Sequence, residues 1–244
     1  MSFSSFVEQL EQRHLADLRF SDVTRALRAL SSAYVERRES AIADHKVLDG
    51  AGKRAAFALY YGPIHFLLVQ HILRQLDVTP SPGLVVDLGC GTGVAGAAVA
   101  TSTAATRVLG IDTHPWTLDE ARFTYQSFGL RADVRRGHAA RTRFPSETSF
   151  VVAAFVVNEL KDADRAVLRD HITQSKRPSL IIEPISHRIS PWWPEWVEAT
   201  GGRADEWKFP IDPPPIVKRL AKAAGLRPDS LTARSLLITG RRPS

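Results

Sequence analysis

Residues 85–96 read VVDLGCGTGVAG, a short β-branched strand that runs directly into a turn rich in glycine. Glycine adopts backbone conformations that other residues avoid, and it leaves no Cβ between the backbone and a bound ligand. Such a turn after a strand is therefore typical of a ligand-binding loop, and a glycine turn without a ligand is the alternative. The residues around the glycines indicate which ligand the loop would bind.

The glycines of this loop fit two patterns at once. Gly91, Gly93 and Gly96 match G-x-G-x-x-G, the pattern of dinucleotide-binding loops. A second pattern, D-x-G-x-G-x-G, is formed by Asp87, Gly89, Gly91 and Gly93. It resembles motif I of the S-adenosylmethionine (SAM)-dependent methyltransferases. The first pattern predicts hydride transfer, and the second predicts methyl transfer.

Asp87 distinguishes between the two patterns. A carboxylate just before the turn repels the negative charges of a pyrophosphate, whereas the methionine part of SAM carries an ammonium group that a carboxylate attracts. Asp112, which ends the next predicted strand, fits both patterns because a carboxylate can accept both hydroxyls of a ribose. We therefore interpret the loop as a SAM site and Gly96 as a glycine that packs within the following helix.

Strands and helices alternate on both sides of the loop, which predicts an α/β fold with a mostly parallel sheet and helices on both of its faces. The C-terminal stretch RPDSLTARSLLITGRR, at 227–242, is predicted to form two strands. The other predicted strands cover 83–89, 107–112, 131–137, 149–157 and 178–184, and the predicted helices cover 94–101, 115–129, 162–174 and 216–225.

The first 80 residues are predicted to be helical. The loop TPSPG at 79–83 separates this N-terminal helical extension, 1–80, from the SAM-binding domain, 81–244. A helix over 51–61 is expected to end at Gly62, and Pro63 to begin the next one. The stretch between Arg54 and Arg74 has no charged residue and is as long as a membrane span, but a break at Gly62 leaves two short helices. We therefore expect no membrane segment.

The region 84–244 resembles the class I SAM-dependent methyltransferases, through VVDLGCGTG as motif I and GID as the ribose acid. The resemblance implies a Rossmann-like seven-stranded sheet with an antiparallel last strand. It also implies that SAM lies along the carboxyl ends of the first three strands, with residues 137–139 beside the adenine. Many family members have an Asp there, where this chain has His138 or Ala139. The cofactor residues expected on this basis are Asp87, Gly89, Cys90, Gly91, Gly93, Asp112, Thr113, His138, Ala139 and Asn158.

The fourth strand ends in Val-Asn-Glu-Leu at 157–160, where the family places residues that face the transferred methyl group. This is not the N-P-P-aromatic signature of enzymes that methylate exocyclic amines. We expect Asn158 to contact SAM and Glu159 to bind or deprotonate the acceptor; the alternative is that Glu159 is an ordinary acid at the start of a helix. Cys90 has no evident base beside it, so a small packed side chain is expected rather than a nucleophile.

A narrower resemblance is to the Rsm22-like family, methyltransferase-like proteins of the small ribosomal subunit. It rests on FSDVTRALRALSSAYVERR, AFALYYGPIHFLLVQHIL, VVNEL and LIIEP. It implies ribosomal RNA as acceptor and the small subunit as partner. Longer members have a C-terminal cysteine cluster, but this chain has only Cys90, so we expect neither a metal nor an iron–sulfur centre. A small-molecule methyltransferase and a non-catalytic ribosome-assembly factor are the alternatives.

The charge of the chain bears on the acceptor. The net charge is +6, and the densest basic segment, RADVRRGHAARTR at 131–143, has five arginines and one aspartate. A basic surface beside an active site attracts RNA, although a solvated arginine-rich face explains the same segment.

Residues 185–215 hold four tryptophans and are expected to form a cap or lid at the acceptor pocket. The tryptophans either stack on a base or form the core of a cap packed on the N-terminal helices, and the second reading is favoured. No secretory signal is visible in the N-terminal residues, so a cytoplasmic location is expected. The sequence does not indicate the oligomeric state.

Overall fold

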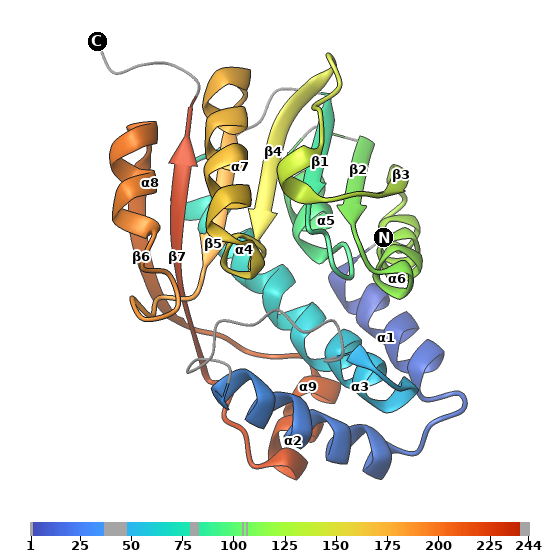
Figure 1. Cartoon of the computed structure of the whole chain (residues 1–244). Helices are drawn as coiled ribbons and strands as arrows, with labels where there is room; N and C mark the ends of the chain where they lie inside the picture. Colours follow the sequence, from blue (N-terminus) through green and yellow to red (C-terminus); the bar gives the residue numbers. More distant parts are fainter. Residues whose placement is uncertain (1, 37–47, 79–82, 104, 106, 240–244) are drawn as a thin grey trace.

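The computed structural model describes residues 2–36, 48–78, 83–103, 105 and 107–239. Its centre is a seven-stranded sheet in the order β3-β2-β1-β4-β5-β7-β6 (Figure 1). Strand β7 is antiparallel to both of its neighbours, and the other adjacent pairs are parallel. This confirms the predicted Rossmann-like sheet. The strands are β1 (Leu84–Leu88), β2 (Arg107–Asp112), β3 (Arg131–Arg136), β4 (Thr148–Ala154), β5 (Ser179–Glu183), β6 (Arg203–Pro210) and β7 (Ser230–Ile238).

The central strands are buried on both faces. In β1, Val85 packs into one core cluster and Val86 into the other, because successive side chains of a strand point to opposite faces. One face is covered mainly by α4, α5, α6 and α9, and the other by α7 and α8. These helices are α4 (Gly62–Gln75), α5 (Val94–Thr101), α6 (Pro115–Ser127), α7 (Asp162–Ser175), α8 (Trp193–Thr200) and α9 (Pro215–Ala224).

The N-terminal helices are α1 (Phe3–His14), α2 (Phe20–Glu36) and α3 (Ala51–Ala56). In Figure 1 the arrowheads of β2 and β4 point toward these three helices, so they lie beyond the carboxyl ends of the parallel strands. Their apolar side chains join the same core cluster as one face of the sheet. The buried members include Phe6, Leu10, Val23, Leu27 and Leu30.

The expected helix break at Gly62 was wrong. Residues Ala51–Gln75 form one continuous helix, in which the segment Phe57–Tyr61 is π-helical. Pro63 has no N–H to donate and its ring crowds the preceding turn, which normally ends or kinks an α-helix. Here the turn before Pro63 is wider, with the Gly62 N–H bonded to the carbonyl of Phe57, five residues back, so the helix continues through the proline.

This helix is long and apolar enough to cross a membrane by length and composition. However, 67 % of its most apolar window is buried inside the protein, as expected of a core helix in an α/β domain. The absence of charge between Arg54 and Arg74 therefore corresponds to packing within the fold.

Up to residue 239, where the described residues end, the C-terminal stretch forms one strand, β7, rather than the two that were expected. The second antiparallel partner is β6, which lies inside the segment 185–215 that was expected to be a cap or lid. Strand β6 is the edge of the sheet and carries charged residues along most of its length, RADEWKFP, as edge strands often do. Its sequence therefore lacks the apolar alternation that identifies a half-buried strand.

Gly96 lies within α5 and packs tightly. A Cβ at this position would lie 2.6 Å from Asp87 Oδ2 and 3.0 Å from Val108 Cγ1. Gly52, in α3, has more room, because a Cβ there would lie 3.4 Å from Ala26 Cβ. The two positions are thus a matched pair of helical glycines with opposite surroundings.

We expect Gly96→Ala to lower the free energy of unfolding by about 1–3 kcal/mol, because the added methyl overpacks the contact with Asp87. The control Gly52→Ala should raise it by about 0.5–1 kcal/mol through helix propensity. Urea unfolding of both variants measures this, and a stabilising Gly96→Ala would show that the helix does not need the close approach.

Candidate functional site

The glycine loop connects β1 to α5, and three of its glycines have left-handed φ angles. These are +60° at Gly89, +52° at Gly91 and +79° at Gly93. A Cβ at Gly89 would lie 2.2 Å from Val156, and one at Gly93 would lie 2.9 Å from the Ala121 backbone, so both glycines are required by packing. A Cβ at Gly91 would meet no heavy atom within 4 Å. Gly91 is therefore where a ligand has room to approach the backbone.

Asp87 anchors this loop on its buried side. Its Oδ2 accepts the Gly96 N–H at 2.8 Å and the Tyr125 hydroxyl at 3.0 Å, which joins β1 to α5 and α6. The residue is 1 % exposed, and its Oδ1 is buried without a hydrogen-bond partner in the described part of the chain. Burial raises the pKa of Asp87 to about 7, against the two hydrogen bonds, which lower it, while the charge of Asp112 adds to the increase. An unsatisfied carboxylate oxygen is a group that a bound cation would stabilise.

Asp112 ends β2 and faces the loop. Its Oδ2 accepts the Gly91 N–H at 2.9 Å, and its Oδ1 accepts the His114 N–H at 2.9 Å. Each carboxylate oxygen has a second lone pair, so both can still accept a ribose hydroxyl. The structure thus brings the expected ribose acid and the open glycine into direct contact.

The expected adenine-side residues lie next to Asp112. The Gly137 N–H donates to the Asp112 carbonyl at 2.9 Å, and residues 137–139 leave β3 at that point. Ala139 is buried, and His138 has a buried Nδ1 without a hydrogen-bond partner among the described residues. Thr113 follows Asp112 directly, and its carbonyl accepts the Arg136 Nε–H at 3.2 Å.

Cys90 lies within the loop, but its side chain faces the core. It is 5 % exposed, and its Sγ lies 3.1 Å from where a Cβ of Gly110 would be. Burial, with the charges of Asp87 and Asp112, raises the pKa of the Cys90 thiol well above its ordinary value. The thiol is therefore protonated at neutral pH, and a role as nucleophile does not fit. Within the loop, Cys90 could therefore contact a ligand only through its backbone.

The chain leaves β4 through a strained residue. Phe155 has a φ of +60°, which costs a non-glycine residue about 1–3 kcal/mol. It is held there by the hydrogen bond from its N–H to the Ile182 carbonyl at 2.8 Å. The next residue, Val156, packs on Gly89, so the end of β4 and the glycine loop touch each other.

Asn158 is bound on both sides of its amide. Its Nδ2 donates to Glu183 Oε2 at 2.5 Å, and its Oδ1 accepts from the Ser190 hydroxyl at 2.8 Å and from Trp192 Nε1 at 2.9 Å. Glu183 Oε1 also accepts the Val157 N–H at 2.7 Å. The amide therefore ties the end of β4 to the end of β5 and to the segment after it. This arrangement suits a positioning residue.

Glu183 is fully buried at the carboxyl end of β5, and sequence reasoning missed it. Burial raises its pKa to about 8, with a further increase from Glu159, against the hydrogen bonds from Asn158 and Val157 and the charge of Arg234. Arg234, 1 % exposed, donates to the Pro184 and Ile185 carbonyls at 3.0 and 2.9 Å. The signal in the sequence was an acid at the end of an apolar strand, LIIE.

Three of the tryptophans in 185–215 are buried, Trp192 at 8 %, Trp193 at 7 % and Trp196 at 1 % exposure. Stacking of these rings on an exposed base does not fit. They also pack with α7 on the far face of the sheet rather than on the N-terminal helices, which corrects the expected location. Glu159, by contrast, is exposed at the end of β4.

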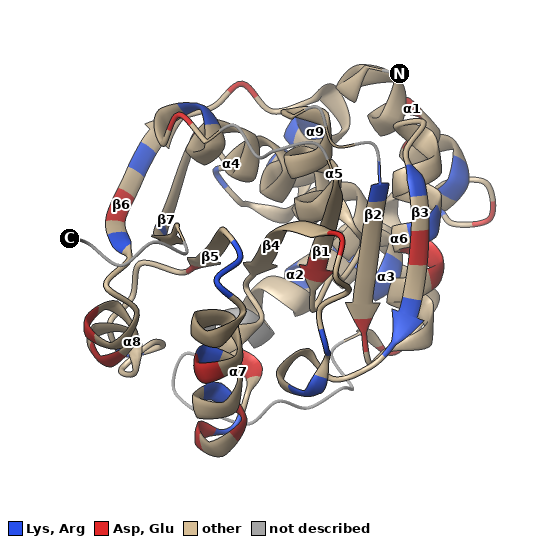
Figure 2. Cartoon of the chain, turned by 90° about the horizontal axis from the view of Figure 1, so that it is seen from above, with Lys and Arg blue, Asp and Glu red and all other residues tan. Residues whose placement is uncertain are grey.

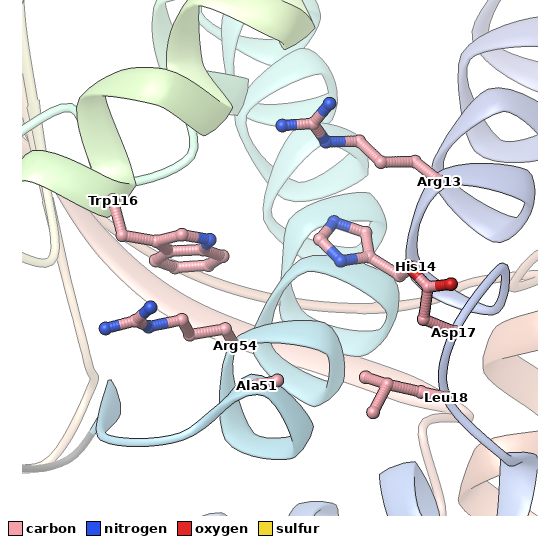
Figure 3. Close-up of a pocket in the computed structure, with 7 residues that line it drawn as sticks. All are labelled: Arg13, His14, Asp17, Leu18, Ala51, Arg54 and Trp116. Carbon is pink, nitrogen blue, oxygen red and sulfur yellow. The ribbon is translucent and has the colours of Figure 1, made fainter.

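A cavity of about 230 Å³ lies between α1, α3 and the start of α6 (Figure 3). The Arg54 guanidinium lies 5.7 Å from the centroid of the Trp116 ring, four residues after Asp112. None of the expected cofactor residues lines this cavity. The lining residues are Arg13, His14, Asp17, Leu18, Ala51, Arg54 and Trp116.

The glycine loop, the acid at the end of β2 and the sheet order are typical of a SAM-dependent methyltransferase, with SAM as its cofactor. The comparisons agree. Residues 85–178 match the family model described as a methyltransferase domain, which begins at β1 and ends just before β5. No curated protein sequence matches the chain.

A solved methyltransferase structure shares this fold, and two others align with lower scores. The mitomycin 7-O-methyltransferase MmcR aligns with a TM-score of 0.50 at 15 % identity, over 84 % of this chain and 59 % of that one. The methyltransferase domain of a bacterial Hen1 protein gives 0.49 at 14 %, over 73 % and 98 %. The Pyrococcus abyssi tRNA (uracil-54, C5)-methyltransferase, in complex with S-adenosyl-L-homocysteine, gives 0.46 at 13 %, over 69 % and 38 %.

The raised pKa of Asp87 predicts how stability depends on pH. The folded protein holds this proton more tightly than the unfolded chain, whose carboxyl has a pKa of about 3.9. Between about pH 4 and pH 7 this group therefore lowers the free energy of unfolding as the pH rises, by up to about 1.4 kcal/mol per pH unit. In Asp87→Asn the decline between pH 5 and pH 7 should be shallower by about that amount, measured by urea unfolding.

The matched control is Asp119→Asn, since the Asp119 side chain is 67 % exposed. It should leave the slope unchanged. Equal slopes in the protein and Asp87→Asn would mean that Asp87 is ionised in the fold throughout this pH range.

Proposed function

We propose that this chain transfers the methyl group of SAM to RNA, with ribosomal RNA as the expected acceptor. The observation that carries the methyl-transfer part is the contact between Gly91 and Asp112. It combines a backbone position open to a ligand with a carboxylate that still has two acceptor lone pairs. That combination suits a nucleoside joined to an amino acid.

The residues divide the cofactor between them. Gly91 and the loop around it would lie against the methionine part, with the ammonium group near the unpartnered Asp87 Oδ1. Asp112 would bind the ribose, and His138 and Ala139 would flank the adenine, with Thr113 and the Cys90 backbone beside them. Bound SAM supplies an activated methyl group, so the protein contributes mainly proximity and orientation.

The acceptor side lies at the end of β4. Asn158 acts as a positioning residue, because both sides of its amide are already bonded within the protein. Glu159 is exposed there and is the residue that would contact the acceptor. The turn that carries both residues packs on Gly89 through Val156, which keeps the acceptor close to the donor.

The arginines of 131–143 support RNA as the acceptor. Arg135 and Arg136 lie at the carboxyl end of β3, and Arg141 and Arg143 follow in the next turn, all exposed (Figure 2). Arg136 lies next to Asp112 in the register of the adjacent strands β2 and β3. This basic edge therefore borders the expected ribose site. The resemblance to the Rsm22-like family favours the same acceptor and the small ribosomal subunit as partner.

A small-molecule acceptor is the second candidate. It is favoured by the N-terminal helices, which lie beyond the carboxyl ends of the strands and would enclose a small substrate there (Figure 1). A ribosome-assembly factor that binds SAM without transferring its methyl group is the third.

SAM binding is tested by calorimetry. Asp112→Ala should weaken SAM about 10- to 100-fold, because it removes hydrogen bonds to a charged acceptor worth about 1.5–3 kcal/mol. The exposed Asp119→Ala should bind SAM normally. Binding of NAD without binding of SAM would overturn the assignment of the loop.

The acceptor is tested with methyl-labelled SAM, offered undermethylated ribosomal RNA or a pool of metabolites. We expect label in the RNA. Label in a metabolite alone would favour the second candidate, and SAM binding with no transfer would favour the third.

The arginines predict the salt dependence of RNA affinity. Replacing both Arg141 and Arg143 by alanine should weaken RNA binding and reduce the slope of log affinity against log salt by about 2. The control is Arg203→Ala, on β6 at the opposite edge of the sheet, which should keep the slope. Filter binding between about 50 and 200 mM salt measures both; an unchanged slope in the double variant would exclude these two arginines from the interface.

A further inference from the structure

The helix Ala51–Gln75 passes directly against the glycine loop. A Cβ at Gly62 would lie 3.7 Å from Val94 Cγ1 and 3.8 Å from Thr92 Oγ1, so this helix lies beside the loop where it enters α5. The π-helical segment ends at this contact, and π-helical turns occur frequently at functional sites. The side chains of the next helical turn are therefore close to the glycine loop, which is called the donor loop below because it would hold SAM.

His65 is three residues after Gly62 and so lies on the same face of the helix. Its ring stacks on Phe155, with ring centroids 4.4 Å apart and an angle of 27° between the planes, and the Tyr61 ring lies 5.9 Å away. Phe155 is the strained residue that ends β4, and its neighbour Val156 packs on Gly89. His65 thus lies at the end of β4, one turn along the helix from Gly62 beside the glycine loop.

The imidazole of His65 is free to accept a proton. Neither of its nitrogens has a hydrogen-bond partner within the described ranges, and the side chain is half-buried rather than fully enclosed. Burial lowers its pKa to about 4, so the ring is neutral at pH 7 and keeps an acceptor lone pair. The stack on Phe155 fixes the plane of the ring, which a base needs in order to meet a substrate proton.

We propose that His65 is the base of the methyl-transfer reaction, acting on an N–H or O–H group of the acceptor. This rests on the proposed methyltransferase function. The acceptor atom forms a bond to the methyl carbon, the carbon–sulfur bond breaks with its electron pair going to sulfur, and S-adenosylhomocysteine is the product. The acceptor proton passes to the free imidazole nitrogen and then to water. The attacking group becomes much more acidic as its new bond forms, so a weakly basic neutral imidazole suffices.

The position of His65 is tested without an acceptor. The whole protein is saturated with SAM labelled with carbon-13 in its methyl group, and nuclear Overhauser contacts from that methyl to histidine ring protons are recorded. We expect contacts to His65 and none to His71, which lies on the same helix and stacks on Phe209 at 3.5 Å. Methyl contacts that leave out the His65 ring would overturn the proposal, whereas failure of SAM to bind would instead overturn the proposed function.

The chemical role is tested with variants in the transfer assay, using the RNA or metabolite preparation that takes up label. His65→Gln should lower kcat by roughly 10²- to 10⁴-fold, the usual contribution of a general base, with SAM affinity changed by less than about twofold. The matched control His71→Gln should alter neither quantity. A rate within about threefold of the unchanged protein, or a loss matched by weaker SAM binding, would contradict the role of His65.

Chemical rescue separates a base from a residue that only lines the pocket. In His65→Ala, free imidazole added to the assay should restore part of the lost kcat, because it can occupy the space left by the ring and accept the proton. A lost rate that imidazole does not restore would overturn the role as proton acceptor.

Discussion

The site depends on the hydrogen bonds of one buried carboxylate oxygen, Asp87 Oδ2. By accepting from Gly96 and Tyr125, this atom fixes β1, α5 and α6 relative to one another. The glycine loop must then cross a short, fixed gap. Burying a carboxylate is costly, and its two bonds offset only part of that cost, as its raised pKa indicates. The rest of this cost comes from the unpartnered Oδ1, and a cationic group of a ligand would reduce it.

A second constraint links the loop to the end of β4. Phe155 adopts its strained conformation because three neighbouring contacts determine the path of the chain: its own N–H on Ile182, Val156 on Gly89, and the Val157 N–H on Glu183. Strain of this size persists only where the surroundings over-determine it. The glycine loop and the turn after β4 are therefore packed together, and a shift of one would move the other.

The parts of this fold that were predictable are those in which local sequence and burial agree. The central strands are apolar runs because both of their faces are buried, and α5 and β2 were predicted with the bounds that the structure has. The pattern D-x-G-x-G-x-G and Asp112 predicted a cofactor loop, and the structure brings the two into contact. Strand β6 was missed because an edge strand exposes charged side chains and loses the apolar alternation.

The other failures also have physical reasons. Gly62 and Pro63 normally end a helix, but a π-helical turn accommodates the missing N–H, which no local pattern reveals. Whether a tryptophan is buried, and against which face of the sheet, depends on tertiary packing. Glu183 and His65 contact residues distant in sequence, Asn158 and Phe155, so only the fold brings these pairs together.

The lack of charge between Arg54 and Arg74 also has a physical reason. A helix that crosses the carboxyl edge of a parallel sheet lies where ligands of such folds bind, and it cannot place a charge against the donor loop without cost. Gly62 lies beside that loop, where an added Cβ would meet Val94 and Thr92 at ordinary van der Waals distances. The ring of His65, one turn later, lies on Phe155 at the strained end of β4, whereas His71 of the same helix stacks on Phe209, away from this end. Within this helix, the position of His65 therefore points to chemistry more directly than its composition does.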